Sequence, residues 1–212
     1  VVARGGLEAA DVDDDQPGSL SQEDFESFFH QIRRFLTVQE QIDLFSRWFE
    51  AGAADAGFLT VLALTAAGFS RRKPEFLEQA RERMQTVANA DLDPMPLLGC
   101  LDLLLGNVKD ADRHFAVLRD PDLQAWFLNH PGDRLAAQCE YCRAWLERDV
   151  LPGYRDVDAS VADLDAWFAD RDVQGFVDRL DRKASRQIGS DDMTLAWATA
   201  GDASPWRADR TS

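Results

Sequence analysis

Three cysteines come nearest, by residue type and spacing, to a chemical site in this chain. Cys139 and Cys142 stand three residues apart, as in half of a zinc site, and Cys100 together with a histidine could complete the ligand set. In the middle of a helix, however, the same spacing places both thiols in one apolar stripe with Leu135 and Leu146. Three thiols cannot all pair within the chain, and such sparse use fits a reducing compartment. We therefore expect buried cysteines, with no metal site, no cofactor and no disulfide framework.

A second motif, His130 to Asp133, reads H-P-G-D and resembles the H-P-D loop through which J domains stimulate Hsp70 chaperones. Glycine interrupts the motif. A basic helix should precede such a loop, but the segment from Leu123 to Asn129 carries no positive charge. A plain turn between two helices is therefore the preferred interpretation, and a J-domain-type co-chaperone is kept as an alternative.

Carboxylates are numerous enough to hide an acid-base pair. A hydrolase should also set such a pair against a cleft with sugar-binding or phosphate-binding elements, and no such grouping is visible. The sequence contains no G-x-S-x-G, no glycine-rich phosphate loop and no H-E-x-x-H. We predict a non-enzymatic protein without catalytic residues, with an enzyme of unrecognised type as the alternative.

The charge balance narrows the choice of partners. The 212 residues include 38 acidic and 23 basic side chains, for a formal net charge of -15. This excess disfavours binding to nucleic acid or to an anionic membrane and favours a basic peptide. Arg71, Arg72 and Lys73 form the one basic cluster, either a solvated loop or an anchor for an acidic segment or a terminal carboxylate. The longest mostly apolar run, Phe58 to Phe69, is too short to span a bilayer.

Two helices rich in aromatic residues are predicted within the stretch from Ser21 to Glu50. Apolar residues recur there at steps of three and four, which is the period of one helix face. Thr37 and Glu40 interrupt the pattern as T-x-x-E, a capping box that predicts the start of a second helix. The two stripes are Phe25, Phe28, Ile32 and Phe35, followed by Val38, Ile42, Phe45 and Phe49.

The remainder of the chain also has helical periodicity, and no segment alternates as a strand would. Gly68 is expected to end the third helix, Pro74 to begin the fourth and Asp133 to cap a long later helix. The further helices are predicted at about Asp55 to Ala67, Pro74 to Val87, Met95 to Leu105, Asn107 to Leu118, Pro121 to Leu128, Asp133 to Leu146, Ala162 to Phe168 and Val173 to Leu180.

One stretch matches the spacing by which tetratricopeptide helix pairs interlock. Gly99, Ala111, Phe115 and Leu118 occupy the small and aromatic positions, although Asp102 stands where an aromatic residue is usual. No second copy appears at the same period. We therefore predict an all-α fold of antiparallel helical pairs, loosely tetratricopeptide-like, as a single helical domain over residues 21–183. Residues 1–20 and 184–212 are predicted to be a flexible N-terminal segment and a flexible C-terminal tail or linker.

Between about Gly5 and Leu180, the chain contains a series of short motifs that occur in the same order in a known protein family. They resemble the cytosolic or stromal region of the membrane-anchored cell-division proteins of cyanobacteria and plastids, the ZipN-like family that includes the accumulation-and-replication-of-chloroplasts proteins. The motifs are Gly5-Gly6-Leu7, Asp24-Phe25, Gln41 to Phe45, Ala63-Leu64, Gly68-Phe69, Lys73-Pro74, Leu103 to Val108, Cys142-x-x-Trp145-Leu146 and Val150 to Asp156.

The resemblance implies a division adaptor whose middle region is this chain. Such a region recruits FtsZ through its C-terminal peptide and tethers the division ring at the cytoplasmic side of the inner membrane. The chain itself is expected to be soluble, to reach the membrane only through segments outside it, and to serve other division proteins besides FtsZ. A helical scaffold for other division proteins, without direct FtsZ binding, is the alternative.

We expect the peptide in a groove between helices, with buried aromatic anchors and acidic rims that attract its basic residues. The edge formed by Arg33, Arg34 and Gln39, around the Thr37 break, is the favoured place. The candidate peptide-binding residues are Phe29, Arg33, Gln39, Phe45, Arg71 and Lys73.

Overall fold

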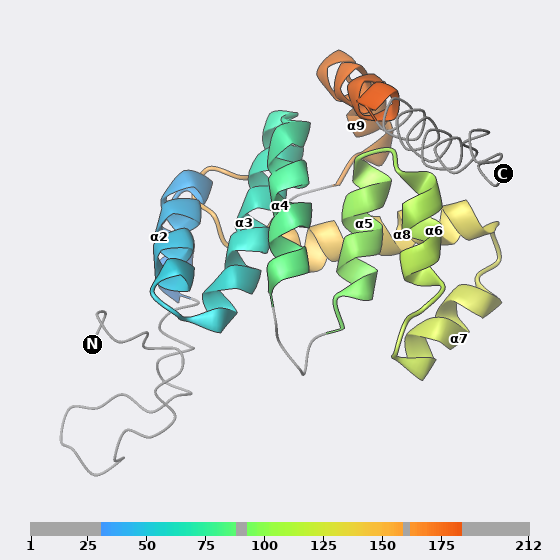
Figure 1. Cartoon of the computed structure of the whole chain (residues 1–212), viewed down its shortest axis with the longest axis horizontal. Helices are drawn as coiled ribbons and strands as arrows, with labels where there is room; N and C mark the ends of the chain where they lie inside the picture. The colour runs from blue at the N-terminus through green and yellow to red at the C-terminus, as the bar shows by residue number, and fades with distance from the viewer. Residues whose placement is uncertain (1–30, 88–92, 159–161, 184–212) are drawn as a thin grey trace, which may run out of the picture.

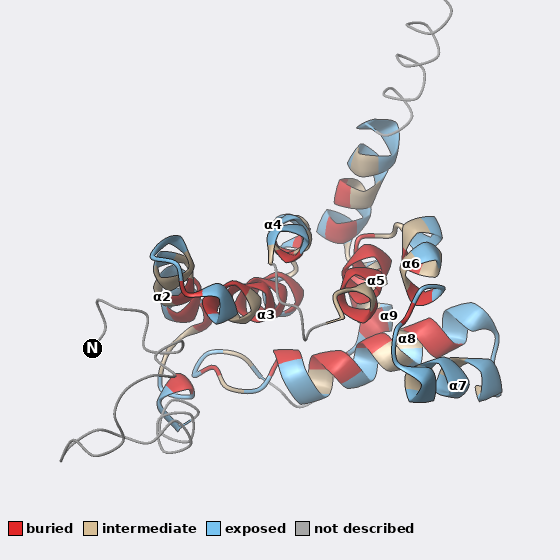
Figure 2. Cartoon of the chain, turned by 60° about the horizontal axis from the view of Figure 1, so that its bottom comes forward, coloured by how far each residue is buried: buried red, intermediate tan, exposed pale blue. Residues whose placement is uncertain are grey.

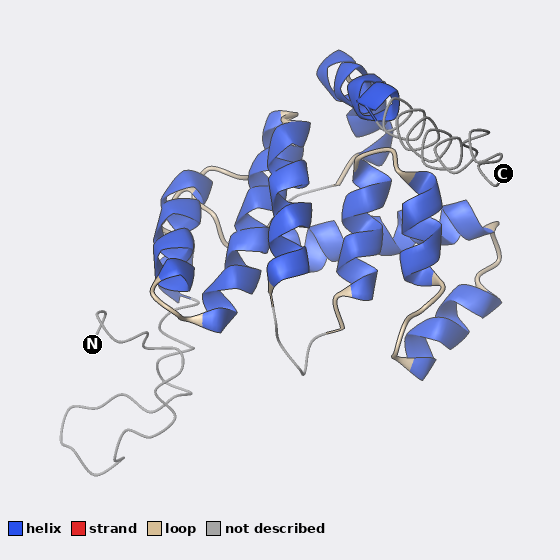
Figure 3. Ribbon diagram, viewed as in Figure 1, coloured by secondary structure: helices blue, strands red, loops and turns tan. Residues whose placement is uncertain are grey.

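The computed structural model describes residues 31–87, 93–158 and 162–183, and these residues form helices joined by short loops (Figures 1 and 3). No strand occurs within these ranges, so the predicted all-α class is confirmed. The flexible segments predicted at 1–20 and 184–212 lie outside the described residues. The elements are α2 Val38–Glu50, α3 Ala54–Arg71, α4 Pro74–Thr86, α5 Met95–Leu104, α6 Val108–Phe115, α7 Pro121–Asn129, α8 Arg134–Trp145, the π-helical turn η2 Leu146–Val150, α9 Leu164–Ala169 and a helix over residues 171–183.

The capping box before α2 is confirmed. The hydroxyl of Thr37 accepts a hydrogen bond from the backbone N–H of Glu40 at 3.2 Å, and a Glu40 carboxylate oxygen accepts one from the Thr37 N–H at 2.7 Å. Both donors would otherwise be unpaired at the helix start. Of the helix predicted before this break, residues 31–33 are helical and the part from Ser21 to His30 lies outside the described residues.

Helix α3 runs through the middle of the stack, between α2 and α4 (Figure 1). The prediction that Gly68 ends this helix is wrong, because α3 continues to Arg71 and the chain turns at Arg72, whose φ is 56°. A Cβ at Gly68 would lie 3.1 Å from Leu77 Cγ of α4. The glycine therefore marks a close approach between two helices. The predicted start of α4 at Pro74 is confirmed.

Helices α5 and α6 interlock as the tetratricopeptide-like spacing predicts. A Cβ at Gly99 would lie 2.7 Å from the ring of Phe115, so only glycine allows this ring to pack there. Asp102, at the position where an aromatic residue is usual, is completely buried. Its carboxylate pairs with Arg81 Nε of α4 and lies 2.9 Å from His114 Nδ1 of α6. A cluster of polar side chains, which includes the Arg81–Asp102 ion pair, thus links three helices at this position.

From α8 to η2 the chain runs back along the stack toward α2 (Figure 2). Together with η2, α8 crosses the other helices and packs against α5 and α3 (Figure 2). The chain then turns at Gly153, whose φ is 95°, and residues 151–157, here called the return segment, come back to α2. The Arg155 N–H donates to the Leu36 carbonyl at 2.9 Å. A carboxylate oxygen of Asp156 accepts from the Val38 N–H at 2.7 Å.

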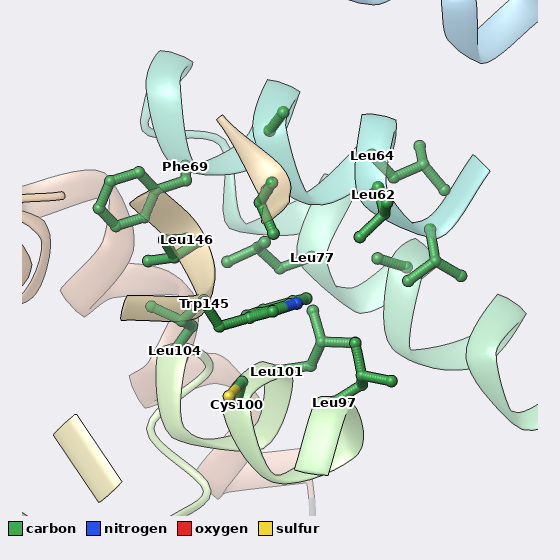
Figure 4. Packing of buried hydrophobic residues seen from close by; sticks show 14 of the residues in the cluster. Leu62, Leu64, Phe69, Leu77, Leu97, Cys100, Leu101, Leu104, Trp145 and Leu146 are labelled. Carbon is green, nitrogen blue, oxygen red and sulfur yellow. The ribbon is translucent and has the colours of Figure 1, made fainter. Parts of the chain in front are cut away.

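One continuous apolar core joins these parts, which confirms the prediction of a single helical domain. Figure 4 shows the indole of Trp145 between Leu77 and Leu101, which belong to α4 and α5. At the other side, the ring of Trp167 from α9 stacks on Phe69 at 5.3 Å and its N–H donates to the Leu104 carbonyl at 2.9 Å. Among the described helices, none has both the length and the apolar character that crossing a bilayer requires.

Candidate partner-binding groove

A hollow of about 830 Å³ lies between α3, the start of α5, and α8 with its π-helical turn. This volume falls within the range of sites that enclose a bound ligand. Apolar side chains from α3, α5 and α8 line most of it. They are Phe58, Leu59, Leu62, Leu97, Tyr141 and Trp145.

Local sequence and long-range packing each contribute to the groove. On α3, Phe58 and Leu62 are four residues apart and therefore lie on one helix face. Phe58 and Leu59 are only half-buried, so this face remains open to a partner. The opposite wall exists because α8 crosses back over α3 and α5, which brings Trp145 against them.

Arginines mark one edge of the groove. Arg33 is 8% exposed, donates from Nε to Gln41 Oε1 at 3.0 Å, and lies over the rings of Phe45 and Tyr154 at 5.7 and 5.8 Å. These contacts hold its guanidinium in one place. Arg34 is exposed and has no ion pair or hydrogen bond of its side chain within the part of the chain that the structure describes.

The acidic residues of the groove are already engaged. Asp93 accepts hydrogen bonds from the backbone N–H groups of Met95 at 3.1 Å and Arg119 at 2.9 Å. Asp149 accepts two from Arg148, at 2.9 and 2.7 Å. Three arginines and two aspartates line the groove, so its edge is not acidic. The expectation of acidic rims is wrong for this groove, because the net charge of a whole chain does not determine its local distribution.

The Tyr141 phenol in the groove wall is a hydrogen-bond donor. Its half-buried position raises the pKa of Tyr141 to about 12. A phenol is protonated at physiological pH even at its usual pKa, so Tyr141 can donate a hydrogen bond to a partner.

The structure separates the residues predicted on the first two helices. Arg33 lines the groove, whereas Phe45 is completely buried, contacts Arg33 and does not line the groove. Gln39 is exposed on α2 and donates to Asp43 at 3.0 Å. Phe29 lies outside the described residues.

Two further predicted residues, in the α3–α4 connection, already have acidic partners. Arg71 forms an ion pair of 3.1 Å with Asp156 of the return segment, and Lys73 lies 4.0 Å from Asp172. Neither lines the groove. A partner carboxylate would have to compete with these aspartates.

Sequence reasoning missed the α8 side of the groove, which includes Tyr141 and Trp145. An apolar stripe reveals that a helix packs, but it does not reveal which distant helix it packs against. The only local signal was the presence of two large aromatic residues, four apart, beside the cysteine stripe.

The cysteines lie as predicted for core residues. Cys100 and Cys142 are completely buried and Cys139 is half-buried, and all three are free thiols. Burial raises the pKa of the Cys100 thiol well above its usual value, which keeps it protonated and unreactive. No group of three potential metal-ligating side chains occurs among residues 31–87, 93–158 and 162–183.

The H-P-G-D motif forms the turn between α7 and α8, in agreement with the preferred interpretation. Asp133 caps α8 by accepting a hydrogen bond from the Ala136 N–H at 2.8 Å, as predicted.

The comparisons with known proteins agree with this architecture. A family model described as "ARC6: Plastid division regulator alpha solenoid domain" matches residues 35–200, which is more than half of the chain. Neither a curated protein nor a solved structure matches the chain. The matched region includes every labelled helix and both walls of the groove.

Proposed function

The chain belongs to the family of ARC6 plastid division regulator alpha-solenoid domains, and from this premise we propose that it is a non-enzymatic adaptor that binds the C-terminal peptide of FtsZ. Membership of a family of division regulators supports a role in division. The observation that carries the proposal is the groove between α3 and α8, which has an apolar lining and, at its edge, an exposed arginine that pairs with no other described residue.

Apolar contacts would supply most of the affinity. Side chains of the peptide would pack on Phe58 and Leu59 from α3 and on Tyr141 from α8, which line the groove and are half-buried. Aromatic and apolar residues in a water-excluding pocket dominate the energetics of most interfaces. A volume of about 830 Å³ accommodates several side chains, so a short segment of the peptide would occupy it.

Arg34 would orient the peptide. Its guanidinium is exposed and pairs with no side chain of the described residues, so it can bind a carboxylate of the peptide, either an acidic side chain or the chain terminus. Arg33, held by Gln41, would add positive potential without having to rearrange. The groove therefore suits a peptide that presents a carboxylate beside apolar residues.

In the cell, this binding would connect the division ring to the membrane. The connection would run through segments outside this chain and would hold FtsZ at the cytoplasmic side of the inner membrane. The chain would act as the peptide-binding part of that tether.

A titration of the chain with a fluorescently labelled FtsZ C-terminal peptide tests the proposal. We expect saturable binding, loss of binding in Leu59→Asp, and weakening by about fivefold in Arg34→Glu, since an exposed charge contact contributes about 1 kcal/mol. Lys109→Glu is the matched control, because Lys109 is an exposed cation on α6 without a described partner. Absence of saturable binding to the unmodified chain would rule out the proposal.

A scaffold for other division proteins is the second candidate. It is favoured by apolar side chains exposed near α7, where Leu128 is 86% and Val117 58% exposed. A chain that binds division proteins through this surface and ignores the FtsZ peptide would support the scaffold role.

A further inference from the structure

A second hollow, of about 380 Å³, lies where α7 meets α8, and the proposed groove does not use it. Helix α7 contributes Asp122, Trp126 and Asn129, which are spaced four and three residues apart and so share one face. His130 and Glu140 complete its polar lining. No lysine or arginine is among the lining residues.

The histidine in this hollow holds a carboxylate in place. His130 Nδ1 accepts a hydrogen bond from the Gly132 N–H at 3.1 Å, so the ring hydrogen of the neutral form lies on Nε2. That Nε2–H then donates to Glu140 Oε2 at 2.8 Å. The Glu140 side chain remains 61% exposed, which leaves its other oxygen available to a ligand.

A second carboxylate, that of Asp122, also lines the hollow. Within the part of the chain that the structure describes, the carboxylate of Asp122 makes no hydrogen bond or ion pair. The amide nitrogen of Asn129 donates to the Ala125 carbonyl at 2.8 Å, so the amide oxygen is the group left to accept. The hollow thus offers three acceptors and no cation of its own.

An exposed indole accompanies these acceptors. Trp126 is 37% exposed, and its ring is held by an edge contact with Phe127 at 5.0 Å and by the ring of His130 at 5.1 Å. A fixed indole beside carboxylates attracts cations through its π-electrons.

An apolar surface adjoins the hollow. Leu128 stands three residues after Ala125, which lines the hollow, and is therefore its neighbour on the helix surface. Leu128 is 86% exposed, and no side chain of α7 is fully buried. The cation that the hollow accepts would therefore lie next to an aliphatic contact.

We infer that this hollow binds an arginine side chain of a partner protein, with an adjacent aliphatic residue of the partner packing on Leu128. A guanidinium is planar and can stack on the Trp126 indole while donating to Asp122 and Glu140. A lysine ammonium can donate but cannot stack. The site is separate from the groove, so it does not rest on the proposed binding of FtsZ.

Nuclear magnetic resonance of the tryptophan indole N–H groups tests this inference, with Trp126→Phe identifying the Trp126 signal. The probes are acetyl-leucyl-arginine amide and its citrulline analogue, which has nearly the same shape but no charge. We expect the arginine probe to shift the Trp126 signal saturably and to bind about tenfold more tightly than the citrulline probe. The lysine analogue should bind about threefold more weakly than the arginine probe.

Single substitutions locate the site. Asp122→Asn and Glu140→Gln should each weaken arginine binding by about tenfold. Asp165→Asn is the matched control, because Asp165 occupies the same position at the start of α9 and is also exposed. Unchanged signals of the other indoles confirm that each variant is folded.

Three results would overturn the inference. They are equal shifts with the arginine and citrulline probes, unchanged affinity in both carboxylate variants, and lysine binding as tight as arginine binding. A Trp126 signal that depends on protein concentration without any probe would point to self-association and would also overturn it.

Discussion

The two ends of the helical stack differ in how far other parts of the chain cover them. At the α2 end, the return segment folds over the first helix: Asp156 binds the Val38 N–H, and Gln41 donates to the Gly153 carbonyl at 2.7 Å. At the α7 end, α8 packs against one side of the helix, and no side chain of α7 is fully buried. The α2 end is therefore covered by the return segment and is here called the closed end. The α7 end keeps an exposed helix face and is called the open end.

The contacts at the two ends also differ in how far apart their residues lie in the sequence, which affects how rigid each end is. The contacts at the α2 end join residues that are 118 positions apart, as for Val38 and Asp156, so they form only when the whole domain is folded. The α7 contacts are local, such as the hydrogen bond from Gln124 to the Leu118 carbonyl, six residues away. A groove beside the closed end is held rigidly by the core. A helix at the open end can separate from the domain at a smaller free energy.

The largest difference in unfolding free energy between the two ends should come from replacing one phenylalanine at each end by alanine. Phe45→Ala should lower the free energy of unfolding by about 4 kcal/mol, because Phe45 is completely buried and also supports Arg33. Phe127→Ala, at a half-buried residue, should lower it by about 2 kcal/mol. Urea denaturation measures both, and equal losses would contradict the distinction between the ends.

A smaller effect is expected from the two glutamines that bond to distant or local carbonyls. Gln41 is completely buried and bonds Arg33 and the carbonyls of Arg33 and Gly153, so Gln41→Ala should lose about 3 kcal/mol. The exposed Gln124 makes one such bond, and Gln124→Ala should lose about 1 kcal/mol. If Gln124→Ala proves the more damaging change in the same denaturation assay, then α7 is more tightly integrated than its burial indicates.

The dependence of stability on alkaline pH probes the closed end without removing any packed side chain. Burial raises the pKa of Tyr154, at the closed end, to about 12 from its usual value of 10. The folded protein therefore keeps a proton that the unfolded chain releases, and stability falls as the pH rises from about 10 through about 12. The part of the loss that comes from Tyr154 should reach about 3 kcal/mol and should be absent in Tyr154→Phe.

Tyr141→Phe is the matched variant for this pH experiment. The pKa of Tyr141 is also raised to about 12, but its ring is only half-buried, so solvent should reduce its share of the loss. Unfolding free energies of the two variants and the parent chain, measured at neutral pH and above the usual tyrosine pKa, separate the two tyrosines. A slope that Tyr154→Phe leaves unchanged would show that this phenol does not titrate on unfolding.

The smallest effect on stability should come from the open end itself. Leu128 is 86% exposed, so Leu128→Ser should change the free energy of unfolding by less than about 0.5 kcal/mol. Amide hydrogen exchange should also be faster in α7 than in α2. Protection of α7 equal to that of α2 would contradict an open end.

Sequence reasoning succeeded where a local signal determines a structure. The capping box of Thr37 and Glu40, the first-turn proline at Pro74 and the cap at Asp133 each involve residues within one turn. It was wrong at Gly68, because a glycine suits both a helix end and a close helix contact. The return segment could not be predicted, because its hydrogen bonds join residues about half the chain apart and leave no periodic pattern.

The candidate site was predictable only in part for the same reason. Arg33 was predicted at the edge around the Thr37 break, and it lines the groove. Phe45 was an equally good candidate from its stripe, but only tertiary packing, which includes its contact with Arg33, determines that it is completely buried. The α8 wall with Trp145 depends on a helix crossing that periodicity does not encode.

Titration with the FtsZ C-terminal peptide, carried out with variants at both ends of the stack, tests directly whether this chain binds FtsZ through the groove. We predict saturable binding that Leu59→Asp removes and that Asp122→Asn, in the separate α7 hollow, leaves unchanged. Binding that survives Leu59→Asp would contradict the assignment to the groove, and no saturable binding would contradict FtsZ recognition by this chain.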